Sequence, residues 1–153
     1  MNITAFDIAQ RFVGTTEVAG EVSNPHILSM LKLDNKWPEG DEVPWCSAFV
    51  NYVTWLLRLP RSKSLLARSW LTIGKDVPLD QAESGFDVVI LKRGSGAQPG
   101  PENTTASGHV GFYAGQSGSS VGGFVQVLGG NQSDSVKVSS YPKSRLLGVR
   151  RLI

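Results

Sequence analysis

The segment Pro44-Trp45-Cys46-Ser47-Ala48-Phe49-Val50 holds the only cysteine of the 153-residue chain, and it predicts the first turn of a buried helix. Apolar residues continue at helical spacing from Cys46: Phe49, Val50, Val53 and Leu57. Backbone N–H groups at a helix N-terminus stabilise a thiolate, which is the reactive form of cysteine. The alternative is a small buried hydrophobic residue, because free cysteines are commonly buried.

The hydrophobic period of the chain changes near its middle. Helical spacing predicts helices over residues 5–13, after Asn24-Pro25, and over residues 65–71 behind a cap at Ser64. Residues 86–91, 109–114, 124–128, 136–138 and 147–151 are predicted strands between glycine-rich turns. Helices followed by strands predict one α+β domain over residues 1–153, with an antiparallel sheet of about five or six strands packed against the Cys46 helix.

Composition excludes several classes of function. The net charge of +2 is mild, and the basic residues form no stripe with interleaved aromatics, so we expect no nucleic-acid partner. No stretch approaches the roughly 20 apolar residues of a membrane span, and we expect no membrane insertion. The N-terminus has an acidic Asp7 and no basic opening, so we expect synthesis in the cytoplasm without a signal peptide. We expect a monomer.

A cysteine nucleophile needs a base that takes its proton and a polar group that orients the base. His109 begins a predicted strand, and alternation places it on the face opposite Val110 and Phe112. A loop over residues 92–108, expected to be mobile, leads to it. Asn131 follows the next strand, where its side-chain oxygen would accept the Nδ1–H of His109, although alone it would be a turn residue. His26 lies in a separate helix and is expected at the surface or partly packed.

We expect neither a metal nor a cofactor. Cys46 and the two histidines lack the close ligand pairs of zinc sites. The acidic residues Glu39, Asp41 and Glu42 precede the cysteine, but they fall short of a calcium loop, and a solvated loop is favoured.

Three motifs carry a family pattern: Pro44-Trp45-Cys46-Ser47-Ala48-Phe49-Val50, Gly108-His109-Val110-Gly111-Phe112-Tyr113 and Gly129-Gly130-Asn131-Gln132. They resemble the CHAP and NlpC/P60 superfamily of papain-like cysteine peptidases and amidases, which cut peptidoglycan. Segments that resemble a small single-domain group of bacteriophages and prophages are Phe12-Val13-Gly14, Asn24-Pro25, Ala67-Arg68-Ser69-Trp70-Leu71 and Tyr141-Pro142-Lys143-Ser144-Arg145-Leu146-Leu147-Gly148. The resemblance spans nearly the whole chain and implies a papain-like fold.

The resemblance implies a role for each residue of the motifs. Cys46 would be the nucleophile, His109 the base and Asn131 the orienting residue. Many CHAP domains place a glutamate two residues before that asparagine, where this chain has Gly129. The orienting role would then rest on Asn131, with Gln132 or Asp134 as helpers or replacements.

Three more residues are candidates for substrate binding. Trp45 would wall the cleft and contribute, with the Cys46 N–H, to an oxyanion hole, or it would simply pack in the core. Tyr113 would line the site or merely pack on its strand face, and Gln132 would contact the substrate. The acidic loop before Cys46 would alternatively recognise an amine of the peptide stem.

The hypothesis that follows is a peptidoglycan hydrolase that cleaves an amide bond, within the peptide stem or between the muramyl sugar and alanine. It would be a phage or prophage lysin that reaches the periplasm or cell wall after release, part of a virion, or an exported toxin. Alternatives are a non-catalytic virion or wall-binding module, and a papain-like transferase or deamidase acting on proteins. The last shares the acyl-enzyme step, so the sequence does not separate it from a hydrolase.

Overall fold

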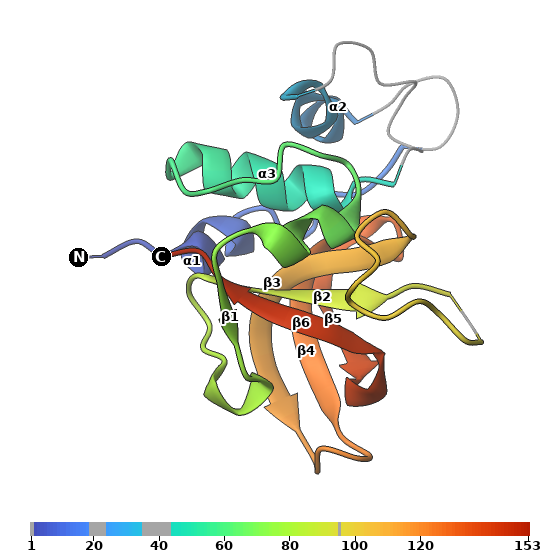
Figure 1. The fold of residues 1–153 in the computed structure, drawn as a ribbon. Coiled ribbons are helices and arrows are strands. Elements are labelled where there is room, and N and C mark those ends of the chain that lie inside the picture. Colours follow the sequence, from blue (N-terminus) through green and yellow to red (C-terminus); the bar gives the residue numbers. More distant parts are fainter. Residues whose placement is uncertain (1, 19–23, 35–43, 95) are drawn as a thin grey trace.

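A computed structural model of the chain describes residues 2–18, 24–34, 44–94 and 96–153. Within these residues lies a six-stranded antiparallel sheet in the order β1-β6-β2-β3-β4-β5 (Figure 1). Its strands are β1 (Lys75–Val77), β2 (Asp87–Lys92), β3 (Gly108–Ser117), β4 (Phe124–Gln132), β5 (Ser135–Pro142) and β6 (Leu146–Arg151). Five of these strands match the predicted ones, and the short β1 has no counterpart among them.

Helices cover one face of this sheet. These helices are α1 (Ala5–Gln10), α2 (Pro25–Lys32), α3 (Cys46–Leu56) and the 3₁₀ helix η1 (Ala67–Thr72). Two short 3₁₀ turns, η2 (Leu79–Gln81) and η3 (Lys143–Arg145), lie between strands. Phe49 of α3 packs edge-on against Phe112 of β3, inside a buried cluster that joins the helices to the sheet. A separate cluster lies on the other face: Val77, Val89, Leu91, Tyr113, Val125, Val127 and Val149. The predicted α+β architecture, with an antiparallel sheet against the Cys46 helix, is confirmed.

The predicted helix starts differ in outcome. Asn24 caps α2, accepting a hydrogen bond of 2.9 Å from the backbone N–H of His26. The cap at Ser64 is wrong, because the element that follows is a 3₁₀ helix that begins only at Ala67 and has no side-chain cap. The Ser64 carbonyl instead accepts hydrogen bonds from the side chains of Ser47 and Asn51 on α3, which tie this segment to the helix.

The loop before β3 is anchored by a buried arginine. Its described residues outside the strands, 93–94 and 96–107, form turns and bends and contain no helix or strand. Arg68 of η1 is fully buried and donates to four backbone carbonyls of this loop, those of Pro99, Gly100, Asn103 and Ser107, at 2.8–3.0 Å. The expectation of a mobile loop missed this anchor, which fixes the chain directly before His109.

No helix in the described ranges is long and apolar enough to cross a membrane.

Candidate active site

The structure places Cys46 and His109 side by side. Cys46 is the first residue of α3 and is 2% exposed, and His109 is the second residue of β3. The Cys46 thiol is hydrogen-bonded to the His109 side chain and to the backbone N–H of Val110. The buried start of α3 therefore brings a thiol and an imidazole together, as the sequence predicts.

The surroundings of Cys46 favour its thiolate. Burial alone raises the pKa of the Cys46 thiol. The hydrogen bond and charge of His109 oppose this effect, followed by the Val110 N–H and the more distant charge of Arg93. Together they bring the pKa of the thiol below its ordinary value of 9.0, so the reactive form is more populated at neutral pH.

The amide that orients His109 belongs to Gln132, and not to Asn131 as predicted. Nε2 of His109 lies 2.8 Å from Oε1 of Gln132, and both side chains are buried. The ring is also turned relative to the prediction, because Nε2 rather than Nδ1 faces the amide. Nδ1 is then the ring atom left for the thiol. Asn131 is partly exposed, and its side chain forms no hydrogen bond with another described residue.

Hydrogen bonds around Gln132 determine the tautomer of His109. The Gln132 Nε2 amide donates to the carbonyls of Val127 and Lys137, so its Oε1 must be the atom that faces the ring. A carbonyl oxygen only accepts, and the His109 Nε2 must therefore carry a proton. Nδ1 of the neutral ring is thus free to accept the proton of Cys46, which is the protonation state that a general base needs.

An irregularity in β4 explains why the sequence pattern pointed to the wrong residue. The pairing of β4 with β5 shifts register between Gly129 and Gln132, and Asn131 adopts a left-handed φ of +57°. This bulge changes which residues face His109, and simple alternation cannot anticipate it. Asp134, the other candidate, lies in the turn after β4, also at positive φ.

Gly129 leaves the space that the Gln132 side chain occupies. A Cβ on Gly129 would lie 2.9 Å from Gln132 Oε1 and 3.4 Å from His109 Nε2. A side chain from Gly129 and the observed one from Gln132 would compete for the same contact with the imidazole.

Tyr141 of β5 completes the cluster and was not among the predicted site residues. Its hydroxyl donates to Gln132 Oε1 at 3.0 Å, and its ring centroid lies 5.3 Å from that of His109. Burial, followed by the charge of Cys46, raises the pKa of Tyr141 to about 12, so it remains a donor. The only sequence signal for Tyr141 was its place in one of the segments that carry the family resemblance.

The other predicted site residues do not line an open site. Trp45 is fully buried, donates to the Glu17 carboxylate at 2.6 Å and packs on Gly130, so it has the packing role. Tyr113 lies on the same face of β3 as His109, but it packs in the cluster of Val89 and Leu91, and at four residues from His109 it is about 13 Å further along the strand.

The remaining candidates bear on metal binding. His26 is exposed on α2, as expected. The acidic residues Glu39, Asp41 and Glu42 lie outside the described residues. Across the described ranges, no three His, Cys, Asp or Glu side chains are grouped so that they could hold a metal ion.

Comparison with known proteins identifies a structure of similar fold. No protein-family model matches the chain, and no curated protein matches it. Among solved structures, the chain is similar to that of NlpC1 from Trichomonas vaginalis, with a TM-score of 0.54 and 13% sequence identity. The match covers 97% of this chain and 42% of the NlpC1 chain, so this chain spans less than half the length of that protein. The likeness agrees with the expected papain-like fold.

Proposed function

We propose that the protein is a cysteine hydrolase that cleaves an amide bond of peptidoglycan. The observation that carries the proposal is the buried chain of hydrogen bonds from Cys46 through His109 to Gln132. It supplies a nucleophile, a base in the required tautomer and a group that fixes this tautomer. The cell-wall substrate is supported by the resemblance of the Cys46 and His109 motifs to the CHAP and NlpC/P60 superfamily, and by the similarity in fold to NlpC1.

The proposed reaction has two steps. The Cys46 sulfur attacks the amide carbonyl carbon, and the proton held by His109 passes to the nitrogen as the C–N bond breaks and the amine leaves. Water, deprotonated by His109, then attacks the thioester and releases the acid and the free thiol. The N–H of Cys46, in the first turn of α3, has no intrahelical acceptor and is a donor for the oxyanion.

The proposal extends to where the protein acts. We infer a monomeric phage or prophage enzyme, made in the bacterial cytoplasm, that works on the wall after release or as part of a virion. No nucleic acid, membrane insertion, metal or cofactor takes part in the proposed mechanism.

The test compares the protein with Cys46→Ala on purified peptidoglycan. Mass spectrometry of the soluble fraction should show fragments with new amine ends for the unchanged protein and none for the variant. Those ends identify the bond that is cut. Fragment release that is equal in Cys46→Ala would exclude the thiol mechanism. Acyl transfer to an added amine without net hydrolysis would indicate a transferase, and absence of any reaction would favour a binding module.

A further inference from the structure

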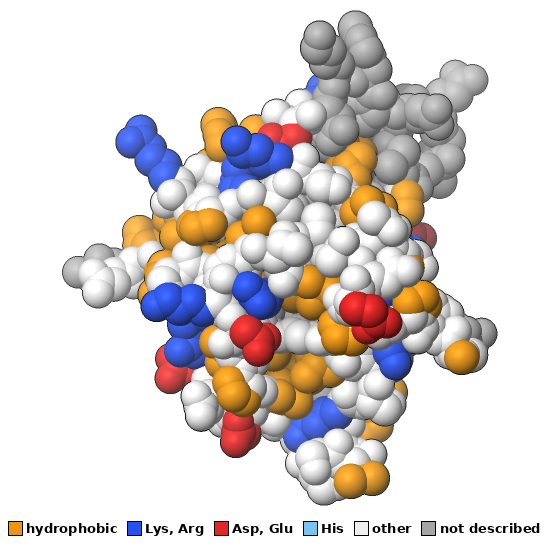
Figure 2. All heavy atoms as spheres, in the orientation of Figure 1, with side chains coloured by type: hydrophobic (Ala, Val, Ile, Leu, Met, Phe, Trp, Pro, Cys, Tyr) orange, Lys and Arg blue, Asp and Glu red, His pale blue; other side chains and the backbone are white. Residues whose placement is uncertain are grey.

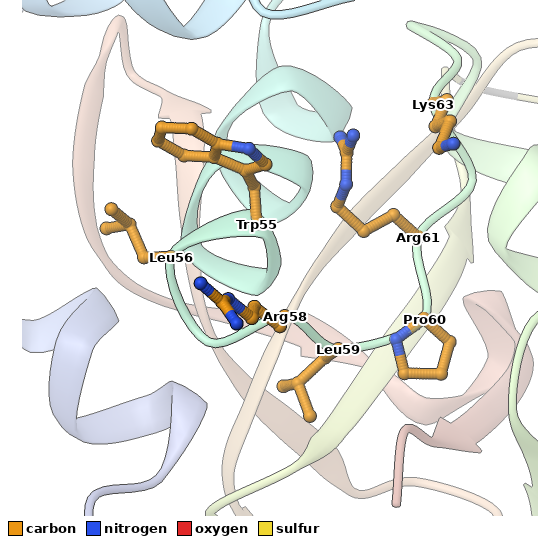
Figure 3. Close-up of a pocket in the computed structure, with 7 residues that line it drawn as sticks. All are labelled: Trp55, Leu56, Arg58, Leu59, Pro60, Arg61 and Lys63. Carbon is orange, nitrogen blue, oxygen red and sulfur yellow. The ribbon is translucent and has the colours of Figure 1, made fainter.

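A cavity of about 760 Å³ lies at the C-terminal end of α3, far from the thiol (Figure 3). It is lined by the last turn of the helix and the segment that follows, including Trp55, Arg58, Arg61 and Lys63. Along the helix axis, Cys46 and Trp55 are separated by about 14 Å. The cavity is therefore distinct from the catalytic cluster but rests on the same helix.

Two cations at this cavity are available to a ligand. Arg61 is occupied, because its guanidinium binds the Asp34 carboxylate through two hydrogen bonds of 2.8 and 3.1 Å. Arg58 and Lys63 are exposed, and neither forms an ion pair with any residue in the described segments. Figure 2 shows basic and hydrophobic side chains gathered over this end of the molecule. The cavity thus has an excess of positive charge.

The backbone places both cations where glycine would be less strained. Arg58 has a φ of +56° at the end of α3, where its N–H binds the Trp55 carbonyl and the next N–H binds that of Thr54. This is the Schellman arrangement, in which glycine is the usual residue at that position. Lys63 has a φ of +55°, and its N–H donates to Asn51. The helix dipole favours a basic side chain at a helix C-terminus, which accounts for Arg58 at this strained position. Lys63 lies in the loop after the helix, so the dipole does not account for a lysine there.

An exposed apolar surface adjoins these charges. Trp55 is 47% exposed and Leu56 is 43% exposed, although both belong to a helix that is otherwise largely buried. The flat face of an indole packs well against the apolar face of a sugar ring, while a guanidinium and an ammonium bind carboxylates. A ligand that fits both features is a saccharide chain that bears carboxylates.

We propose that this cavity is a second binding site for the substrate polymer, occupied by a carboxylate-bearing glycan–peptide segment of peptidoglycan. The inference rests on the proposed function and adds to it a site that holds the enzyme on an insoluble wall. Because the polymer is extended and the two sites are separate, one strand or two neighbouring strands can fill both. Contact at the cavity then raises the effective concentration of amide bonds at Cys46.

The test uses Cys46→Ala as the parent, so that peptidoglycan is bound without being cut. Arg58→Gly/Lys63→Gly in this background should weaken sedimentation with purified peptidoglycan about tenfold, while the melting temperature stays equal or rises because glycine relieves the positive φ. Arg11→Ala/Lys75→Ala removes the same charge at exposed positions elsewhere and should sediment like the parent. Walls stripped of phosphate-containing polymers should give the same result, and amidation of the wall carboxylates should remove the difference between parent and variant.

Several outcomes would overturn the inference. They are unchanged sedimentation of Arg58→Gly/Lys63→Gly, an equal loss in the control pair, a requirement for phosphate polymers, or a loss of self-association alone in analytical ultracentrifugation. A second experiment, with Cys46 intact, tests the second site and the proposed hydrolase function separately. Both the unchanged protein and Arg58→Gly/Lys63→Gly should cut a small soluble muropeptide with the same kcat. Absence of cutting by both would contradict the function, whereas normal cutting with unchanged sedimentation would contradict only the second site.

Discussion

The two ends of α3 use the same residue types in opposite ways. At the N-terminal end, Trp45 is fully buried and donates to Glu17, and Arg68 is fully buried among four carbonyls. At the C-terminal end, Trp55 is 47% exposed and Arg58 projects into solvent. The first end is fixed by internal hydrogen bonds, which hold a thiol in one geometry. The second leaves its polar and aromatic groups for a ligand.

The largest expected effect is on the free energy of unfolding, and it distinguishes the buried Arg68 from the exposed Arg58. Arg68→Met removes the four hydrogen bonds that the buried guanidinium donates to the loop carbonyls, and among these acceptors Gly100 keeps the N–H of Asn103. We expect the free energy of unfolding to fall by about 3–5 kcal/mol, because a network of hydrogen bonds from a fully buried, charged side chain is lost and the loop loses its anchor. Arg58→Met should change it by less than about 0.5 kcal/mol, as exposed substitutions usually do. Urea denaturation of both variants measures the contrast, and similar values would show that the Arg68 contacts are not what holds the loop.

The next effect is on catalysis, from two glutamines. Gln132→Ala removes the acceptor of the His109 Nε2–H and frees the ring to change tautomer. We expect kcat/KM to fall about 100-fold, within the range typical of general acid–base catalysis. Gln116 of β3, whose amide donates to Leu79 and Tyr113, is the matched control.

The Gln116→Ala variant should keep full activity. The assay is hydrolysis of a soluble muropeptide over a range of pH, since a lost tautomer lowers the rate at every pH without removing the nucleophile. Equal losses in both glutamine variants would mean that the bond to His109 has no special role.

A smaller effect tests the packing behind the nucleophile. A Cβ on Gly130 would lie 2.5 Å from Cζ3 of Trp45 and 2.9 Å from Cβ of Phe49, whereas a Cβ on Gly122 would have one neighbour at 3.9 Å. Gly130→Ala should therefore lower stability by about 1–3 kcal/mol through overpacking. Gly122→Ala should have almost no effect. Thermal unfolding followed by circular dichroism distinguishes them, and a neutral Gly130→Ala would show that Trp45 is free to move.

These contrasts also show what the sequence could and could not predict. The sequence predicts the helix at Cys46 and the strand at His109, because hydrophobic periodicity is a local pattern. It also predicts that the two residues meet, because the chain has a single cysteine and a histidine flanked by glycines at the start of a strand. The choice of Gln132 over Asn131 depends on a bulge in β4 and on two carbonyls that fix an amide. The role of Arg68 depends on a loop more than 30 residues away. Hydrophobic periodicity in the sequence predicts neither the role of Gln132 nor that of Arg68.

The smallest expected effect concerns the pKa of the Cys46 thiol and the charges near it. The protein has one cysteine, so the ultraviolet absorbance of thiolate reports Cys46 alone. The pKa of the Cys46 thiol should lie below 9.0 in the folded protein. Between the folded pKa and 9.0, the thiol is protonated in the unfolded chain but ionised in the folded one, so the free energy of unfolding should rise with pH in this range. His109→Ala should raise the pKa of the thiol strongly, since this side chain is the main opponent of the effect of burial.

Arg93→Gln should raise the pKa of Cys46 only slightly, because Arg93 is exposed and acts by charge at a distance. About 1 M salt should abolish that small shift, since it shortens the Debye length to about 3 Å, but should leave the effect of His109 in place. Arg58→Gln, at the far end of α3, should leave the titration unchanged. A shift from Arg58→Gln as large as that from Arg93→Gln would mean that the thiol responds to the net charge of the protein, and the two ends of the helix would no longer be electrostatically separate.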